Sequence, residues 1–596
     1  MDNQAIARVL RETADLLEIK DDNPFKIRAY RNGADIASNH PHDLARLDET
    51  GLREIPGIGK DLAARIVEIA QTGDTAYHRE LVAEFPPTIL DLLHLQGVGP
   101  KTVATLYREL GIRTLDDLER ACADGRIRSL RGMGSKKEAL ILKALDERKR
   151  FDGRHLLPDS HNAAAALVSF LQARAPEAVI EAVGSLRRGC DTCGDLDLLA
   201  SGAPASLMDD FVAYPEVERV LGHGDTKSSI LIRGGFQADL RLVAADSRGA
   251  ALQYFTGSKP HNIALRDRAI GLGFKLNEYG VFRIADDAKV AGEHEEDIYA
   301  ALGLEWVAPE LRELRGEIEA AESKTLPHLI DRADLRGDLH THTTESDGKD
   351  ELRAMAAAAR DAGLEYIAIT DHSQSLAMAN GLDERRALAH AARVRALDAE
   401  GIGIRLLAGI ECDIRSDGSM DLADDCLAAL DIVVASVHSG FNQDRAEMTE
   451  RILKALANPH VDILGHPTGR KLLKRPPYPV DMEAIVDAAA RHGVAIEINC
   501  QVNRLDVNDV HAKLARDRGV PLVISSDAHS RDAFARLRWG VIVARRAWLE
   551  PAQVLNTQPF EQFKASLRRR GSAPAGPKLG NGGSSEGRKA SAERHS

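Results

Sequence analysis

Two aspartates separated by one leucine are the first residues of the chain with a clear chemical use. Asp195 and Asp197 open an apolar run, and alternate side chains of a β-strand share a face, so both carboxylates point to the same side. A third carboxylate, Asp239, lies in the alternating run 236–243, which is expected beside the first strand. Three carboxylates can hold two Mg²⁺ ions about 4 Å apart and promote phosphoryl transfer. A solvated strand edge is the alternative explanation for the aspartate pair alone.

The residues before this pair are suited to phosphate. Gly184 and Ser185 predict a bend with a hydroxyl group and free backbone amides. Arg187 and Arg188 add planar cationic donors that match phosphate oxygens. The segment 184–197 therefore combines a phosphate site with a cation site.

A second set of potential metal ligands follows apolar segments later in the chain. Six such segments end in His, Asp or Glu, and Ala-rich helical stretches such as 351–362 lie between them. This pattern predicts a β/α barrel with its ligands at the carboxyl ends of parallel strands. The nine candidates are His340, His342, Asp347, His372, Glu411, His438, His466, Asp527 and His529. A mixed His/carboxylate set suits Mn²⁺, Zn²⁺ or Fe²⁺ better than Mg²⁺ alone, and predicts two or three ions that support phosphoester hydrolysis.

A glycine hairpin is repeated in the first 150 residues. Segments 55–60, 95–101 and, more loosely, 130–136 place apolar-Gly-apolar-Gly before a helical pattern. Glycines let the main chain approach a phosphate, and free N–H groups at the helix start donate to it without reading base sequence. The predicted DNA contacts are Gly57, Gly59, Lys60, Gly97, Gly99 and Lys101.

Composition limits the class of protein. A chain of 596 residues is long enough for about four domains, each with its own core. The net charge of −13 argues against a basic surface that wraps nucleic acid throughout. The six cysteines are scattered, the start has no apolar leader, and no apolar run can span a bilayer, so we expect a cytoplasmic protein away from membranes. Cys190 and Cys193 lack the second pair that a tetrahedral zinc site needs.

The segment 184–197 resembles the nucleotidyltransferase motif of family X DNA polymerases, with the same spacing from Gly-Ser to the paired aspartates. The resemblance continues at 254–258 and 261–262, and implies that Asp195, Asp197 and Asp239 are catalytic, with Asp239 deprotonating the primer hydroxyl and Arg241 pairing with it. It assigns the incoming nucleotide to Gly184, Ser185, Arg188, Gly194, Tyr254, Phe255, Gly257 and Asn262. Core packing is the alternative for the two aromatic residues.

The barrel segment resembles, motif by motif, the PHP (polymerase and histidinol phosphatase) domain. All nine ligand positions are filled, which implies an active phosphoesterase, foremost a Mn²⁺-favoured 3′-to-5′ exonuclease, with 3′-phosphatase or abasic-site incision as alternatives. Arg504 either holds the substrate phosphate or is simply exposed. The first 80 residues resemble the family's amino-terminal domain, but Arg65 occupies the position of its Schiff-base lysine, and an arginine cannot act as an amine nucleophile, so lyase activity is expected to be weak or absent.

These resemblances imply a multidomain α and α/β fold: N-terminal helix-hairpin-helix domains, a nucleotidyltransferase palm with a mixed sheet, a thumb, and a distorted β/α barrel. The expected divisions are a lyase-like domain at 1–80, fingers at 81–150, palm at 151–260, thumb at 261–320, linker at 321–335, PHP domain at 336–570 and a disordered tail at 571–596. We expect a monomer that fills short gaps in primed DNA with dNTPs. A small-molecule phosphatase of histidinol-phosphatase type and a non-catalytic DNA scaffold are the other hypotheses.

Overall fold

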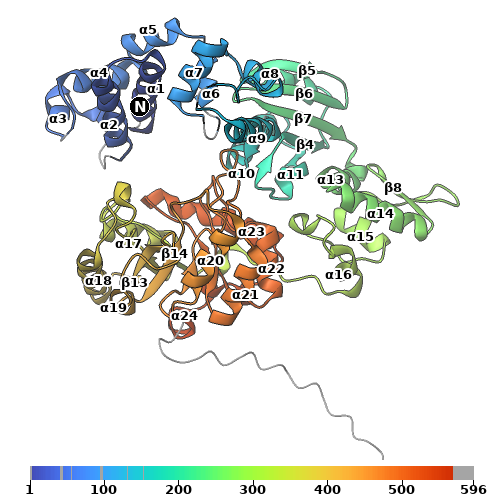
Figure 1. Cartoon of the computed structure of the whole chain (residues 1–596). Helices are drawn as coiled ribbons and strands as arrows, with labels where there is room; N and C mark the ends of the chain where they lie inside the picture. Colours follow the sequence, from blue (N-terminus) through green and yellow to red (C-terminus); the bar gives the residue numbers. More distant parts are fainter. Residues whose placement is uncertain are drawn as a thin grey trace, which may run out of the picture.

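The computed structural model describes residues 3–39, 44–55, 57–86, 88–93, 95, 98–130, 132–151 and 153–567. A helical region, a mixed sheet, a small helix-and-hairpin region and a parallel barrel follow one another along the chain (Figure 1). Gly97 and the tail 571–596 lie outside the described residues. No helix in the described ranges is both long and apolar enough to cross a bilayer.

The helical region is built from amphipathic helices. They are α1 (Asn3–Lys20), α2 (Pro24–Asn39), α3 (Glu49–Arg53), α4 (Lys60–Thr72), α5 (Ala76–Glu84), α6 (Ile89–Leu93), α7 (Pro100–Leu110), α8 (Leu115–Ala123) and α9 (Ser135–Phe151). Helix α1 buries Ile6, Leu10 and Leu17, which share one face at helical spacing and pack towards α2, α4 and α7. Two apolar clusters, one centred on α1–α4 and one on α6–α9, stabilise this region.

The mixed sheet places the aspartates on its central strands. Its order is β2 (Val179–Ala182), β4 (Asp195–Ser201), β7 (Phe236–Val243), β6 (Lys227–Ile232) and β5 (Val217–Gly222), and only β4 and β7 run parallel. Strands β6 and β7 form the expected hairpin, whose turn residues Gly234 and Gly235 have φ of +87° and +79°. Helices α10 (Leu157–Gln172), α11 (Gly184–Arg187) and α12 (Leu207–Val212) and the small pair β1 (His155–Leu156) and β3 (Thr192–Cys193) complete this part.

The next region combines helices with a three-stranded antiparallel sheet. Its elements are α13 (Arg248–Thr256), α14 (Lys259–Gly271), β8 (Phe274–Asn277), β9 (Gly280–Arg283), β10 (Lys289–Ala291), α15 (Glu295–Ala301) and α16 (Glu317–Ser323). A fully buried guanidinium, Arg312, lies 2.6 Å from Glu295 and fixes the loop before α16. The predicted linker 321–335 is packed rather than free, because the buried Ile330 donates its N–H to Leu549 O at 2.9 Å.

The carboxyl-terminal region is a seven-stranded parallel sheet that closes on itself. The strands, in spatial and sequence order, are β11 (Gly337–Asp338), β12 (Tyr366–Ile369), β13 (Arg405–Asp413), β14 (Ile432–Ser436), β15 (Ile463–Leu464), β16 (Ala495–Asn499) and β17 (Leu522–Ser525). The N–H of His342 donates to Ala528 O at 2.8 Å, which joins the ends of the first and last strands. The predicted barrel is thereby confirmed.

Helices cover the outside of this barrel. They are α17 (Leu352–Asp361), α18 (Glu384–Ala399), α19 (Asp424–Ala428), α20 (Arg445–Leu456), α21 (Met482–His492), α22 (Asp509–Asp517), α23 (Leu537–Arg546) and α24 (Phe560–Ser566). One apolar cluster runs from the mixed sheet into the barrel, and His161 of α10 packs edge-on against Trp539 of α23 with ring centroids 5.4 Å apart. The mixed sheet and the barrel are therefore packed together.

Candidate active sites

The parallel pairing of β4 and β7 brings the three aspartates to one place. Asp197 lies opposite Asp239 in the register, and Asp195 precedes Asp197 on the same face. Gly184 adjoins them, because a Cβ at this position, where φ is +64°, would lie 2.5 Å from Asp197 Oδ2. Only glycine lets the bend approach the carboxylate this closely.

The electrostatics of the three aspartates differ. Burial, together with the charges of Asp195 and Asp239, raises the pKa of Asp197 to about 6. Burial also opposes the charge of Asp239, but hydrogen bonds, above all from Lys227, outweigh it and lower its pKa. The cation paired with Asp239 is Lys227, whose Nζ lies 2.8 Å from Asp239 Oδ2, and not Arg241 as the resemblance implies. The guanidinium of Arg241 lies instead over the Phe255 ring, 4.5 Å from its centroid.

The phosphate end of the motif is a short loop around α11. Gly184 and Ser185 open this helix, and Gly194 separates β3 from β4. Arg188 donates from Nη1 to Thr256 O at 2.5 Å and from Nε to Glu313 Oε1 at 3.0 Å. Arg188, the residue predicted to bind phosphate, is therefore held between the mixed sheet and the region that follows it.

The predicted nucleotide segment lies at the end of α13. The rings of Tyr254 and Phe255 pack edge-to-face, 5.1 Å apart. Gly257 has φ of +71°, and a Cβ there would lie 3.2 Å from Arg188 Nη1, so the glycine main chain and the guanidinium are neighbours. Asn262 donates from Nδ2 to Tyr254 O at 2.7 Å, which fixes its amide beside the aromatic pair.

The glycine hairpins share one local geometry. The N–H groups of Ile58, Val98 and Met133 donate to the carbonyls of Ile55, Leu95 and Leu130 at 3.1, 3.1 and 3.0 Å. The central apolar residue of each hairpin is buried, which anchors the turn. The repeat predicted from the sequence thus corresponds to a repeated structure.

Two of these hairpins offer open helix starts. Gly59 and Gly99 directly precede α4 and α7, and a Cβ at either position would meet no atom within 4 Å. Lys60 and Lys101 follow them and are exposed. Gly57, with φ of +93°, supplies the sharp turn of the first hairpin. Arg65, further along α4, pairs with Glu68 at 3.1 Å and lies over the Tyr77 ring.

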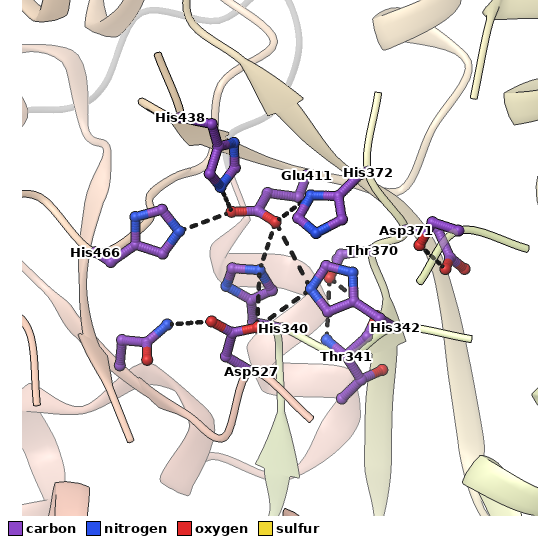
Figure 2. Close-up of polar contacts among 12 residues, drawn as sticks. His340, Thr341, His342, Thr370, Asp371, His372, Glu411, His438, His466 and Asp527 are labelled. Carbon is purple, nitrogen blue, oxygen red and sulfur yellow. Dashed lines mark hydrogen bonds and ion pairs between the residues drawn. The ribbon is translucent and has the colours of Figure 1, made fainter. Parts of the chain in front are cut away.

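Glu411 is the centre of the barrel mouth. Its two carboxylate oxygens lie between 2.8 and 3.6 Å from ring nitrogens of His340, His342, His372, His438 and His466 (Figure 2). Burial opposes the charge, yet the surrounding histidines hold the pKa of Glu411 well below its ordinary value. The residues come from five different strand ends, so the barrel topology alone brings them together.

Two further carboxylates complete the cluster. Asp527 Oδ1 lies 3.3 Å from His342 Nε2, and Asp347 Oδ1 lies 3.5 Å from His372 Nε2 and 3.4 Å from His529 Nε2. All nine predicted ligands therefore converge. Three groups bring their ligand atoms within 4.8 Å of one another in the described part of the chain, and all three are in the barrel. The aspartates of the mixed sheet do not reach this closeness.

Residues behind the ligands orient them. Glu497 Oε1 lies 2.7 Å from His340 Nδ1, Asp413 Oδ1 lies 2.5 Å from His438 Nδ1, and Asn499 Nδ2 donates to Asp527 Oδ2 at 2.9 Å. Such partners fix the ring orientation of metal-binding histidines. These three residues were not predicted from the sequence, although Glu497 and Asn499 alternate at the end of β16 as the ligands do at other strand ends.

The cluster fits divalent cations. Buried ring nitrogens of His340 and His342 have no hydrogen-bond partner among the described residues, which is costly unless a cation binds there. The proximity of other histidines adds to burial and lowers the pKa of His342 to about 4, so its ring is neutral and able to bind a metal. The donor set of imidazoles and carboxylates is one that binds transition-metal ions.

Cations border the cluster on the β15–β16 side. Arg504 Nε is buried without a hydrogen-bond partner in the described ranges, and Arg504 adds to burial in lowering the pKa of His466 to about 3. Lys471 lies nearby, with Nζ 3.4 Å from Asn503 Oδ1. Burial and the charge of Arg504 lower the pKa of Lys471 to about 8. A positive patch therefore adjoins the ligands.

Comparison with known proteins places these sites in a family. Four family models match: a helix-hairpin-helix domain at 1–75, a helix-hairpin-helix tandem at 89–147, a DNA polymerase beta thumb at 251–313 and a PHP domain at 338–501. The DNA polymerase/3′-5′ exonuclease PolX of Bacillus subtilis is 36% identical over 572 residues, which cover 96% of this chain and all of that protein. The chain belongs to the family X DNA polymerases that carry a PHP domain.

Two further relatives of this family X polymerase each match about a third of its chain. Probable phosphatases of Thermoanaerobacter sp. (strain X514) and Shewanella sp. (strain MR-4) are 32% and 35% identical over 231 and 202 residues. These matches cover 37% and 32% of the family X chain and 89% and 75% of the two phosphatases.

Proposed function

We propose that this family X polymerase extends DNA primers at the aspartates of β4 and β7, and removes nucleotides from DNA 3′ ends in its PHP barrel. It acts as a monomer in the cytoplasm, on short gaps in damaged DNA. We also propose that its domains have the limits predicted from the sequence. One observation carries this proposal. A chain that matches a polymerase/exonuclease along its length has three aspartates on the paired strands β4 and β7, and a separate cluster of His and carboxylate ligands in the barrel.

In the mixed sheet, Asp195, Asp197 and Asp239 would hold two Mg²⁺ ions, whose positive charge would favour attack by the primer oxygen and departure of the leaving phosphate. Asp239 accepts the proton of the primer hydroxyl. Arg188 and Ser185, with the amides of the α11 loop, hold the triphosphate. Tyr254, Phe255 and Gly257 exclude a 2′-hydroxyl by close packing, and Asn262 contacts the base edge.

The glycine hairpins hold the DNA during this reaction. Gly57, Gly59, Lys60, Gly97, Gly99 and Lys101 contact backbone phosphates, independently of base sequence. The open space before α4 and α7 supports this role, because a phosphate can reach the free amides there.

In the barrel, the nine clustered residues hold two or three ions, with Mn²⁺ favoured and Zn²⁺ or Fe²⁺ as the other candidates. When bound, such ions would supply an activated water and positive charge for the phosphate during hydrolysis. Glu497, Asp413 and Asn499 keep the ligands oriented. Arg504 and Lys471 bind the substrate phosphate beside these ligands. The buried Arg504 Nε, which has no hydrogen-bond partner among the described residues, supports this assignment.

A second candidate for the barrel is phosphomonoester hydrolysis, which the similarity to probable phosphatases favours. The test compares three substrates with the purified protein and Mn²⁺: a recessed DNA 3′-hydroxyl, a DNA 3′-phosphate and histidinol phosphate. We expect nucleotide removal from the first. Release of inorganic phosphate from the third, without digestion of DNA, would replace the exonuclease with a small-molecule phosphatase.

A further inference from the structure

A helix of the PHP domain packs against the loop that carries Arg188. Gly189 has φ of +67°, and a Cβ at this position would lie 2.3 Å from Cγ2 of Ile542 on α23. A side chain at this position would require Ile542 to shift. The palm loop 188–191 and α23 are therefore in direct contact (Figure 1 shows α23 on the side of the barrel that faces α10 and α11).

Arg546, the last residue of α23, joins this loop to the thumb. Its Nη1 donates to the main-chain carbonyl of Arg188 at 2.8 Å and lies 3.1 Å from Glu313 Oε1. The same Glu313 oxygen accepts from Arg188 Nε at 3.0 Å. The side chains of Arg188, Glu313 and Arg546 are 15%, 19% and 9% exposed. Charges shielded from water to this degree interact strongly.

The arrangement bears on nucleotide binding, since Glu313 and a triphosphate are both anions that Arg188 can bind. With Arg546 in place, Glu313 is shared between two guanidinium groups, and the carbonyl of Arg188 is fixed. Without Arg546, Glu313 would act on Arg188 alone and compete with the triphosphate. Asp509, which accepts from Arg546 Nη2 at 2.9 Å, holds the guanidinium in this position.

We propose that Arg546 of the PHP domain is a positioning residue for the polymerase site, which keeps Arg188 available to the triphosphate of the incoming nucleotide. The proposal rests on the role of Arg188 proposed above. The PHP domain thus also helps to form the nucleotide site of the polymerase.

A second contact ties the same loop to the mouth of the barrel. Asp191 Oδ2 lies 2.9 Å from Arg470 Nη1, and Arg470 Nε donates to Arg504 O at 2.8 Å. Arg470 follows the ligand His466 on the same segment. The palm loop is therefore held from two elements of the PHP domain.

The test measures primer extension on gapped DNA by the full-length Arg546→Ala and Arg546→Lys variants at varied dNTP concentration. We expect the KM for dNTP to rise roughly tenfold in Arg546→Ala, because a charge-assisted contact is lost, while kcat changes less than about twofold. Arg546→Lys keeps the charge, so its KM for dNTP is expected to lie between those of the wild type and Arg546→Ala. Arg545→Ala is the matched control: it belongs to the same helix and pairs with Glu310 at 2.7 Å, so its KM is expected to equal that of the wild type.

A double variant separates positioning from loss of structure. In Arg546→Ala/Glu313→Ala no anion competes for Arg188, and the KM is expected to return towards the wild-type value. Digestion of DNA in the barrel serves as the check on folding. An unchanged KM in a nuclease-active Arg546→Ala variant, or a double variant worse than the single one, would overturn the inference alone. Absence of extension by the wild type would overturn the proposed function, and the inference with it.

Discussion

Glu411 Oε2 lies 2.8 Å from Nδ1 of His372 at the centre of the barrel mouth. Each group stabilises the charge of the other. Burial disfavours the charge of His372, yet Glu411 and Asp347 raise its pKa to about 10. The negative charges of Glu411 and Asp347 are thus balanced by the protonated ring of His372. Cations that bind there replace protons, so metal occupancy and the integrity of this cluster are linked.

We expect Glu411→Gln to lower the metal content of the barrel at least about tenfold and to abolish digestion, since the carboxylate contacts five histidines. The metal content of the dialysed protein gives the measurement. Glu400→Gln, which removes an exposed carboxylate paired with Arg353, is the control and is expected to behave as the wild type. Normal metal content in Glu411→Gln would show that the centre is elsewhere.

The raised pKa of Asp197 predicts how the polymerase depends on pH. Below about pH 6 this carboxyl is protonated in the metal-free protein, because burial and two neighbouring carboxylates disfavour its charge. Metal binding must then release the proton, so the Mg²⁺ concentration for half-maximal extension is expected to rise, up to about tenfold per pH unit below 6. A constant Mg²⁺ requirement between pH 5 and 7 would contradict this.

The glycine hairpins predict two separable effects on DNA binding. Gly99→Ala places a methyl group where a phosphate approaches, so affinity is expected to fall severalfold at all salt concentrations while the protein stays folded. Lys101→Ala removes one charge and is expected to reduce the slope of log Kd against log salt by about one. Fluorescence anisotropy with gapped DNA measures both. An unchanged affinity in both variants would remove the second hairpin from the DNA interface.

A buried ion cluster between α11 and the thumb predicts acid sensitivity. Burial opposes the charge of Glu295, but Arg187 and Arg312 outweigh it and lower its pKa to about 2, from 4.5. The stabilisation is therefore present above pH 4.5 and is lost as the pH falls towards 2, on the order of 3 kcal/mol in total. The free energy of unfolding of Glu295→Gln is expected to be lower than that of the wild type at pH 7, and the two values are expected to approach each other at pH 3. The exposed neighbour variant Glu296→Gln is expected to show no such difference, and an equal gap for Glu295→Gln at both pH values would refute the assignment.

The sequence predicted the barrel, the β6–β7 hairpin and the convergence of the barrel residues that follow apolar runs. Strands of the barrel are continuous apolar runs, so a His or Asp that follows each run is located at the mouth by topology alone. Lys227 was not foreseen, because it reaches Asp239 across a hairpin and its charge has no periodic signal. The contact of Arg546 with Arg188 joins residues far apart in the chain, and depends on how the barrel packs against the palm. Packing between domains is what the local pattern does not encode.

The most direct test uses one preparation of gapped, primed DNA with dNTPs and Mg²⁺ or Mn²⁺, and compares Asp195→Ala with His340→Ala. Two independent centres predict that Asp195→Ala loses extension and retains digestion of the 3′ end, whereas His340→Ala loses digestion and retains extension. Loss of both activities in either folded variant would contradict the assignment of synthesis to the palm and of hydrolysis to the barrel.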